Sequence, residues 1–280
     1  MDVNSDALES LKADPAASPI LRSLDFYYGN ADQDAAMDAF YARFVRPGDL
    51  VFDIGAHVGD RIGSFRRLGA RVTAVEPQPL CIRAIREIYA GDEDVVAVEA
   101  VCGAHEGAAR FYVNSANPTV STASAEFIKA ADGASGWQDQ VWDAEMDVPV
   151  ITLDNLIRTH GTPAFAKIDV EGFEASVLAG LSQALPALSF EFTTIERAVA
   201  LRCLDRVTEL GFELFNVSMG ESMNLNFDEW VSSKTMSAHI MALPHEANAG
   251  DIYCLSPRWT PTPAEQRRSA SHGADDQAPL

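Results

Sequence analysis

The sequence predicts an α/β protein in which a mostly parallel sheet carries helices on both faces. From residue 47 onward, short apolar segments alternate with segments of helical periodicity, a pattern typical of parallel sheets. The apolar segment 51–54 runs directly into a glycine turn at 55–59. A strand, a glycine turn and a helix open a nucleotide-binding α/β unit. The 280 residues, 47% of them apolar, suffice for one such domain with a full core.

Residues 1–46 are expected to form an N-terminal cap of short helices, with aromatic residues such as Phe40 and Phe44 at the apolar positions. Pro47 and Gly48 interrupt this pattern and precede the first strand. We expect the sheet domain to span residues 47–257. Its first half is expected to contain strands at 51–54, 71–75 and 95–98, with helices at 62–68 and 80–89.

The alternation pauses after a short strand expected at 110–113. Residues 114–143 are polar, rich in small residues and without clear periodicity. A segment of this length inside a compact domain is often a functional loop. We therefore expect an irregular substrate loop here.

The alternation resumes at residue 148 and continues to residue 255. Strands are expected at 148–151, 163–170, 187–192, 212–217 and 251–255, and helices at 153–160, 173–181 and 195–210. Gly211 supports the end of the last helix, because glycine is favoured just after a helix C-terminus. Residues 258–280 carry proline, serine, glycine and charge with almost no apolar pattern, which predicts a disordered tail.

The charge balance argues against some classes of partner. The chain has 21 Lys and Arg against 41 Asp and Glu, a net charge of −20. Binding to nucleic acid or to an anionic membrane needs clustered cations, so neither is expected. The acidic N-terminus does not resemble a secretory signal, and no stretch of about 18 apolar residues is present. We expect a cytoplasmic protein that acts on a small molecule, and the sequence leaves a homo-oligomer open.

The cysteines are scattered along the chain, with no C-x-x-C pair and no Cys/His cluster. Neither a zinc site nor a disulfide framework is therefore indicated. The four cysteines are expected to be core thiols: Cys81, Cys102, Cys203 and Cys254.

Two carboxylates mark a ligand site at the ends of the first two strands. Asp53 lies at the end of a strand that should be buried on both faces, where ligands bind in open α/β sheets. A buried carboxylate needs partners, and a cationic ligand would supply them. Glu76 ends the second strand about 20 residues after the turn, where an acidic side chain can accept both hydroxyls of a ribose.

The glycine turn departs from the dinucleotide fingerprint G-x-G-x-x-G. The turn has Gly55 and Gly59, but His57 stands where the middle glycine would let a pyrophosphate approach the backbone. Asp53 would also repel a phosphate. The turn therefore suits a phosphate-free nucleoside that carries an amino acid, such as S-adenosylmethionine. We expect His57 to hold the turn through a hydrogen bond rather than to act as a base.

A second group of ionisable residues follows another apolar strand. Lys167, Asp169 and Glu171 alternate along its end and its exit, and alternation places them on one side. Charged residues rarely enter a parallel strand that is covered on both faces, so the group predicts a site. Glu191 ends the next strand and should lie beside them if the two strands are neighbours.

Together these segments resemble the FkbM family of S-adenosylmethionine-dependent methyltransferases, over about residues 49–257. The resemblance rests on segments 53–59, 75–77, 151–154 and 167–180. The block from Lys167 to Glu174 is the most specific of them, because other methyltransferases lack it. The family usually has Asn at the position of His57.

The resemblance implies a Rossmann-like class I methyltransferase with a seven-stranded, mostly parallel sheet whose last strand is antiparallel. It also implies O-methylation of a hydroxyl on a sugar, polyketide or other natural product. In the resulting hypothesis the substrate enters between residues 114–143 and the N-terminal helices. Residues expected to bind the cofactor are Asp53, Gly55, His57, Gly59, Glu76, Pro77, Ala100, Val101 and Asp169, and the expected catalytic residues are Lys167, Asp169, Glu171 and Glu191.

The expected roles leave three alternatives open. Asp169 or Glu171 is the candidate base, with Lys167 lowering the pKa of the hydroxyl or orienting a carboxylate. Alternatively, Asp169, Glu171 and Glu191 could hold a divalent cation, although their spacing does not compel a metal. A nicotinamide-dependent dehydrogenase and a non-catalytic module that only binds the cofactor are the rival functions.

Overall fold

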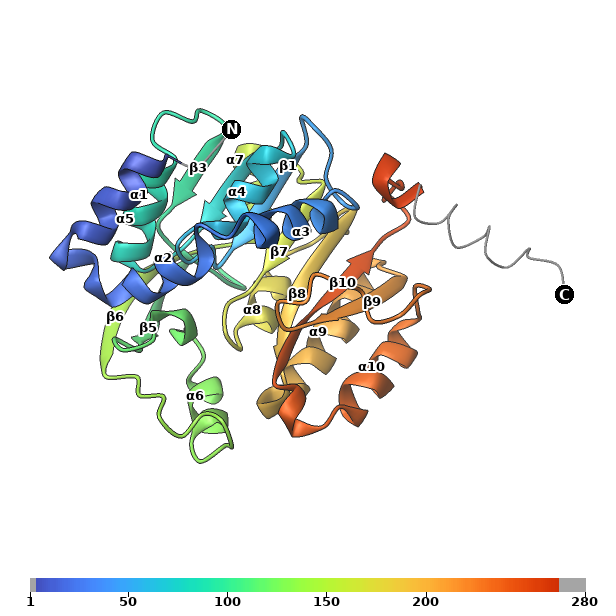
Figure 1. Ribbon diagram of the computed structural model, residues 1–280. Helices are drawn as coiled ribbons and strands as arrows, with labels where there is room; N and C mark the ends of the chain where they lie inside the picture. The colour runs from blue at the N-terminus through green and yellow to red at the C-terminus, as the bar shows by residue number, and fades with distance from the viewer. Residues whose placement is uncertain (1–3, 267–280) are drawn as a thin grey trace, which may run out of the picture.

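A central sheet forms the middle of the computed structural model, which describes residues 4–266 (Figure 1). Within that range the sheet has seven strands in the order β3-β2-β1-β7-β8-β10-β9. The strands are β1 (Leu50–Ile54), β2 (Arg71–Val75), β3 (Val95–Val98), β7 (Phe165–Ile168), β8 (Ala187–Thr193), β9 (Leu214–Met219) and β10 (Ala249–Leu255). β10 runs antiparallel to both of its neighbours, and the pairs from β3 to β8 are parallel. The predicted fold class is confirmed.

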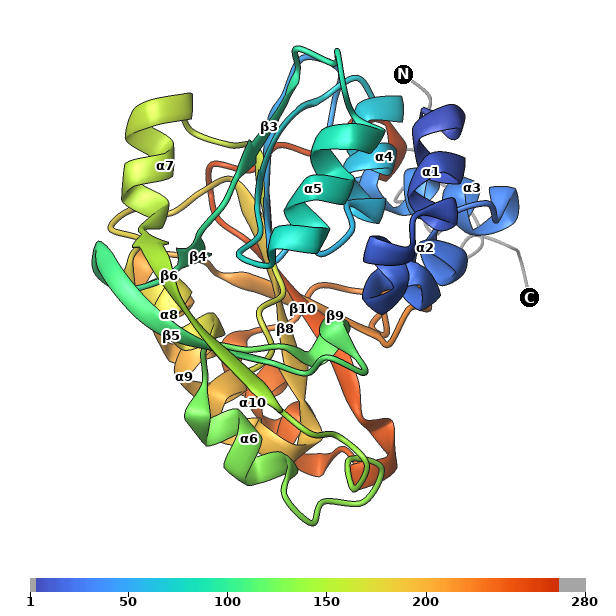
Figure 2. The ribbon, with the colours of Figure 1, turned by 90° about the vertical axis from the view of Figure 1, so that its left-hand side faces the viewer.

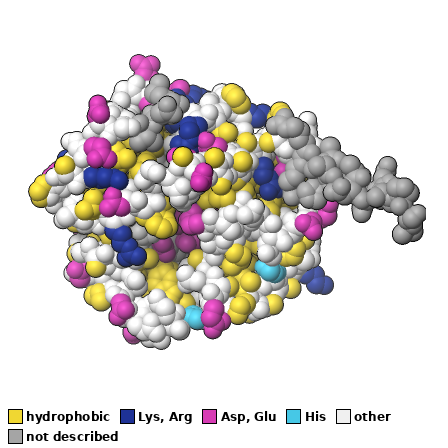
Figure 3. Space-filling view, viewed as in Figure 1, with side chains coloured by type: hydrophobic (Ala, Val, Ile, Leu, Met, Phe, Trp, Pro, Cys, Tyr) yellow, Lys and Arg dark blue, Asp and Glu magenta, His cyan; other side chains and the backbone are white. Residues whose placement is uncertain are grey.

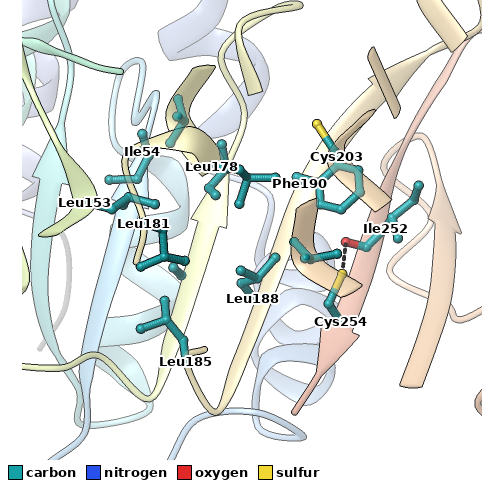
Figure 4. Close-up of a cluster of buried hydrophobic side chains, with 14 of the residues drawn as sticks. Ile54, Leu153, Leu178, Leu181, Leu185, Leu188, Phe190, Cys203, Ile252 and Cys254 are labelled. Carbon is teal, nitrogen blue, oxygen red and sulfur yellow. Dashed lines mark hydrogen bonds between the residues drawn. The ribbon is translucent and has the colours of Figure 1, made fainter. Parts of the chain in front are cut away.

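Helices cover both faces of this sheet (Figures 1 and 2). They are α4 (Asp60–Arg67) and α5 (Pro79–Ile88) on one face and α7 (Leu153–His160), α8 (Glu174–Ala179), α9 (Arg197–Leu210) and α10 (Ser233–Ala242) on the other. Two buried clusters follow from the alternation of side chains along each strand. In β1, Val51 packs with α4 and α5, whereas Phe52 packs on the opposite face. Figure 4 shows part of that opposite cluster, with Leu178 of α8 near Phe190 of β8.

The expected elements correspond closely to the observed ones. The strands expected at 71–75 and 95–98 and the helix expected at 153–160 have the bounds that were predicted. The helix expected from 195 begins instead with a 3-10 turn, η3 (Thr194–Glu196), before α9. Among the described residues the four cysteines are buried and free, as expected, and no described helix is long and apolar enough to cross a membrane.

A second, three-stranded sheet was not expected. It consists of β4 (Val101–Cys102), β5 (Gly107–Val113) and β6 (Ala144–Ile151), in the order β4-β6-β5. β5 and β6 pair antiparallel along their full length and are longer than the strands expected at 110–113 and 148–151. Both strands are largely exposed at their polar positions, so the apolar pattern revealed only their buried ends.

The segment 114–143, expected to be an irregular loop, is not irregular throughout. The segment contains η2 (Pro118–Val120) and α6 (Ala125–Ala131) and has a buried cluster of its own. Phe127 is central to that cluster and packs edge-on against Trp137, with ring centroids 5.2 Å apart. Ser124 caps α6 by accepting from the Phe127 N–H at 3.1 Å. One short helix and two aromatic anchors give too few apolar positions for periodicity to show.

The N-terminal helices lie against α4 and α5, on the face of the sheet that these helices cover (Figure 2). They are α1 (Ser5–Ala13), η1 (Pro15–Ile20), α2 (Leu21–Tyr27) and α3 (Ala31–Tyr41). Their apolar residues join the cluster that contains α4 and α5. The Tyr28 hydroxyl donates to the carbonyl oxygen of Val58 in the glycine turn at 2.8 Å, which positions α2 above that turn.

The expectation of a disordered tail at 258–280 is wrong for its first part. The Thr262 hydroxyl donates to the Ala42 carbonyl oxygen at 2.7 Å, and Glu265 forms a buried ion pair with Arg43 at 2.7 Å. These contacts attach the segment to the end of α3. The remainder, 267–280, lies outside the described residues.

Candidate active site

A pocket opens at the carboxyl ends of β1, β2 and β7. Its empty space, including the part open to solvent, is about 1000 Å³. Figure 3 shows acidic side chains gathered in a hollow near the middle of one face of the molecule. The expected site residues that line the pocket are Asp53, Gly55, His57, Glu76, Pro77, Ala100, Val101, Lys167, Asp169, Glu171 and Glu191. The structure thus brings Asp53 and Glu76 together with the charged group that begins at Lys167, about 90 residues after Glu76.

The glycine turn packs directly against the segment that follows β7. Gly55 has φ 82°, and a Cβ atom there would overlap the backbone carbonyl of Asp169. Only glycine meets both the left-handed backbone and the close approach. Gly59 does not line the pocket. It precedes α4 as the N-cap residue and lies against Ile85 and Tyr89, so its contribution is to the start of the helix.

Asp53 is a buried carboxylate that lacks partners. Its side chain is fully buried, and neither oxygen has a hydrogen-bond partner among the described residues. Burial raises the pKa of Asp53 to about 7, although the charge of Lys167 opposes this. A cationic or donor-rich ligand in the pocket would satisfy both oxygens, so the structure fits the positively charged methionine end of S-adenosylmethionine.

Glu76 is fixed by backbone donors at the end of β2. Its two oxygens accept from the N–H of His57 at 3.0 Å and from the N–H of Gln78 at 2.8 Å. Burial raises the pKa of Glu76 to about 7, while these two hydrogen bonds act in the opposite direction. Each carboxylate oxygen can accept a further hydrogen bond. The orientation is therefore set before any ribose binds.

His57 holds more than the turn. Its backbone is left-handed, with φ 46°, and its N–H is the donor that fixes Glu76. The expectation of a hydrogen bond at the turn is met by the backbone, while the imidazole Nε2 lies 2.8 Å from the Ser23 hydroxyl of α2. Burial lowers the pKa of His57 to about 4, so the ring is neutral at pH 7.

The second group forms a connected cluster of charges. β7 and β8 are adjacent and parallel, with Lys167 opposite Ser189, which places Glu191 beside Asp169. Lys167 Nζ lies 2.5 Å from Asp169 Oδ2. Burial opposes ionisation of Asp169, but the charge and the hydrogen bond of Lys167 prevail and lower its pKa.

Glu171 and Glu191 behave differently from Asp169. Burial and the nearby charge of Asp169 raise the pKa of both carboxyls well above the ordinary value. Glu171 is 8% exposed, and its carboxylate accepts no hydrogen bond from any described residue. Its backbone is left-handed, with φ 54°, a costly conformation for a non-glycine residue that is often found at functional sites. One oxygen from each of Asp169, Glu171 and Glu191 lies within 4.8 Å of the others.

A charged residue of the pocket and one beside the pocket-lining Glu191 were not foreseen. Arg61, at the start of α4, is 6% exposed and forms ion pairs of 2.5 Å with Asp60 and with Glu221. Asp251, in β10, is the register partner of Glu191 and has a buried oxygen without a partner among the described residues. Because β10 is antiparallel, it begins at the same edge of the sheet at which the parallel strands end. A carboxylate near the start of the last strand could therefore have been predicted to lie near the site, and Asp251 is such a residue.

A known protein family matches the part of the chain that contains this site. The methyltransferase FkbM domain matches residues 53–214, which include the glycine turn, Glu76 and the charged cluster. The chain belongs to the FkbM methyltransferase family. The matched residues include the carboxylates Asp53 and Glu76 and the charged group from Lys167 to Glu174. The missing middle glycine already argued against the dehydrogenase alternative.

The chain is similar to a curated relative, 31-O-demethyl-FK506 methyltransferase FkbM of Streptomyces tacrolimicus. The two are 30% identical over 164 residues, which cover 50% of this chain and 62% of the relative. Among solved structures, a TehB-like S-adenosylmethionine-dependent methyltransferase of Corynebacterium glutamicum has a TM-score of 0.41 and 12% identity, covering 84% of this chain and 93% of that one. Fibrillarin of Aeropyrum pernix, with bound S-adenosyl-L-methionine, has a TM-score of 0.42 and 11% identity over 78% and 76%.

Proposed function

We propose that this FkbM methyltransferase transfers a methyl group to a hydroxyl oxygen of a small molecule, sugar or natural product. The observation that carries the proposal is the juxtaposition of two unpartnered acidic groups in one pocket. Asp53 suits the cationic end of the cofactor, and Glu171 suits the proton of an acceptor hydroxyl. The relative's name, which includes an O-demethyl compound as its substrate, supports the same class of acceptor.

The cofactor would be held by residues that already have the right orientation. Asp53 would accept from the amino group, and Glu76 would accept from the ribose hydroxyls. Ala100 and Val101 line the same pocket and would lie against the adenine beside Pro77. S-adenosylmethionine supplies a methyl group on a sulfonium, whose reaction with oxygen needs alignment and removal of water.

Glu171 is the proposed base. Asp169 is engaged by Lys167 at 2.5 Å, and its lowered pKa makes it a weak proton acceptor. Glu171 lines the pocket, and its carboxylate has no hydrogen-bond partner among the described residues, so an acceptor hydroxyl could donate to it. Burial and the charge of Asp169 raise its pKa, so Glu171 binds a proton more strongly than Asp169 does. Glu171 would accept the hydroxyl proton as the oxygen–methyl bond forms, while the sulfur–methyl bond of the cofactor breaks and a neutral thioether leaves.

The acceptor is proposed to enter between α2 and the segment 114–143. A second hollow lies there and shares Tyr27 and Thr119 with the main pocket. A nucleic acid acceptor is not proposed, because the net charge of −20 opposes binding of a polyphosphate. The proposed acceptor is therefore a small molecule that fits this entrance.

Calorimetry with S-adenosylmethionine and S-adenosylhomocysteine tests cofactor binding. We expect a Kd in the micromolar range or tighter for the wild type and a loss of at least about tenfold in Glu76→Ala, equivalent to about 1.4 kcal/mol. Glu93→Ala, at an exposed position outside the pocket, is the matched control and should bind normally. Absence of binding to the wild type would refute the proposal.

Turnover distinguishes the enzyme from a non-catalytic binding module. A panel of hydroxyl compounds is incubated with labelled cofactor, and methyl ethers are sought by mass spectrometry. Glu171→Gln should reduce the rate by about 10²–10⁴-fold without loss of cofactor binding. A rate that depends on added Mg²⁺ and is abolished by EDTA would instead assign Asp169, Glu171 and Glu191 to a cation. Bound cofactor without any product would support the module.

A further inference from the structure

His57 lies where the cofactor pocket meets the entrance groove. The groove runs between α2 and η2, and its wall includes Ser23, Phe26 and Pro118. Tyr27 and Thr119 line both the groove and the main pocket. The His57 ring contacts these walls, because Nε2 is 2.8 Å from Ser23 Oγ and 3.5 Å from Thr119 Oγ1.

The two ends of His57 therefore serve different parts of the site. Its backbone N–H donates to Glu76 Oε2 at 3.0 Å, at the proposed ribose position. Its side chain reaches α2 through Ser23 and η2 through Thr119, and the ring also packs edge-on near Tyr27, with centroids 6.2 Å apart. His57 thus contacts Glu76, the proposed ribose ligand, and both walls of the entrance groove.

Ser23 makes the contact specific. The residue is 7% exposed, and its hydroxyl has no other hydrogen-bond partner among residues 4–266. A buried hydroxyl without a partner is destabilising, so the His57 imidazole stabilises the position of α2. Asn, usual in the family at this position, tolerates the left-handed backbone, but its amide ends closer to the main chain than the Nε2 atom of His.

We infer that His57 is a positioning residue that transmits cofactor binding to the acceptor entrance. The inference rests on the proposed function, because it takes Glu76 as the ribose ligand. These contacts are already formed in the cofactor-free protein. A cofactor bound to Glu76 strengthens the hold of Glu76 on the His57 backbone, and the imidazole in turn holds Ser23 and Thr119 more firmly. The acceptor therefore binds more tightly once the cofactor is bound. Coupling of this kind requires that both events favour the same arrangement.

Hydrogen exchange with S-adenosylhomocysteine as the probe tests this coupling. In the wild type we expect the probe to slow exchange at least tenfold in residues 19–28 and in residues 116–122. His57→Asn should bind S-adenosylhomocysteine with a Kd within about threefold of the wild-type value, measured by calorimetry. The probe should no longer slow hydrogen exchange in either segment of this variant. His57→Gln, whose amide reaches farther, should restore part of it. In Ser23→Ala the probe should no longer slow exchange in residues 19–28 but should still slow it in residues 116–122. The double variant Ser23→Ala/His57→Asn should behave like His57→Asn.

Ser64→Ala is the matched control, because Ser64 is buried with no hydrogen-bond partner among the described residues. It should leave the gain unchanged. Undiminished protection in His57→Asn overturns the inference. A loss of probe affinity above tenfold in that variant also overturns it, because His57 would then bind the cofactor itself. If the wild type binds no probe, the proposed function fails instead. In that case, hydrogen exchange of residues 19–28 in the cofactor-free Ser23 and His57 variants still measures whether the two side chains are coupled.

Discussion

Asp53 and Lys167 are register partners on the adjacent strands β1 and β7, yet their side chains do not pair. Lys167 donates to Asp169 at 2.5 Å, and both oxygens of Asp53 have no partner among the described residues. The cation nearest in the sheet is thus used to keep Asp169 ionised. Asp53 is left for the ligand, which makes the cofactor-free protein less stable than the same fold with a neutral residue there.

Asp53→Asn is expected to stabilise the cofactor-free protein at alkaline pH. The pKa of Asp53 is about 7 in the folded state and about 3.9 in an unfolded chain. The folded state therefore binds more protons between these values, and the contribution of Asp53 to stability falls as pH rises through that window. The ionisation cost of at most about 4 kcal/mol, less the cost of burying an amide, leaves a gain of about 1–3 kcal/mol at pH 8.

Urea unfolding at pH 8 and at pH 5 measures this effect. The gain in the free energy of unfolding should shrink at pH 5, where Asp53 is protonated in the folded wild type. Asp139→Asn, at an exposed position, is the control and should change the unfolding free energy by less than about 0.5 kcal/mol. Asp53→Asn should also lose S-adenosylmethionine binding. A variant that is destabilised at pH 8 would contradict the argument.

The affinity for S-adenosylmethionine is expected to rise with pH up to about 7. Burial raises the pKa values of both Asp53 and Glu76 to about 7, and both are proposed to bind the cofactor in the ionised form. Below pH 7 a proton must leave before the cofactor binds, so Kd should rise by about tenfold for each proton and each pH unit. Calorimetry at pH 6, 7 and 8 in two buffers measures the Kd and the protons released. A Kd that does not depend on pH would show that neither carboxyl changes its protonation state when the cofactor binds.

The sequence was sufficient for the sheet and for most of the site. Apolar segments predicted β1, β2, β3, β7 and β8. All of these except the edge strand β3 are largely buried, and a strand buried on both faces must be apolar almost throughout. Any charge in such a strand is then conspicuous, which is why Asp53, Lys167 and Glu191 could be identified. Their proximity followed from the rule that parallel strands end at one edge of the sheet.

Long-range contacts account for what the sequence did not show. The second sheet pairs residues 107–113 with 144–150 across an intervening helix. Apolar and polar residues alternate only weakly along these exposed strands, so their full length could not be predicted from the sequence. Segment 114–143 is ordered by a few aromatic residues around Phe127. Arg61 pairs with its sequence neighbour Asp60, but its other partner, Glu221, lies 160 residues away. The role of Ser23 depends on α2 lying over the turn, which no local pattern encodes.

Gly55→Ala is expected to be far more damaging than an alanine at another left-handed glycine. The added Cβ of Gly55→Ala would overlap the backbone carbonyl of Asp169, whereas Gly91, which has the same φ of 82°, has no atom within 4 Å of such a Cβ. Both substitutions pay for a left-handed alanine, about 1–2 kcal/mol. Only Gly55→Ala must also move the segment after β7, so its cost should exceed 3 kcal/mol. Thermal unfolding measures both variants, and equal losses would show that the turn can yield.

Thr122→Val is expected to disturb Glu171 without touching its carboxylate. The Thr122 hydroxyl donates to the Glu171 carbonyl oxygen at 2.7 Å and so supports the left-handed backbone that points Glu171 into the pocket. Valine keeps the shape but leaves that carbonyl and the Ser124 N–H, which donates to the same hydroxyl at 2.8 Å, without their partner. The expected loss in the free energy of unfolding is about 1–3 kcal/mol, with hydrogen exchange at residues 170–173 faster by at least tenfold.

Thr159→Val provides the comparison, because the Thr159 hydroxyl donates to the Asn155 carbonyl oxygen at 2.9 Å on an exposed helix. Water can replace that bond, so the loss should stay below about 0.5 kcal/mol. If exchange at 170–173 is unchanged in Thr122→Val, the turn at Glu171 is held by Gly172 and Glu174 alone. Glu174 accepts from the N–H groups of Val170 and Gly172 at 3.0 and 3.2 Å. Slower methyl transfer in Thr122→Val with cofactor binding intact would then require another explanation than the placement of Glu171.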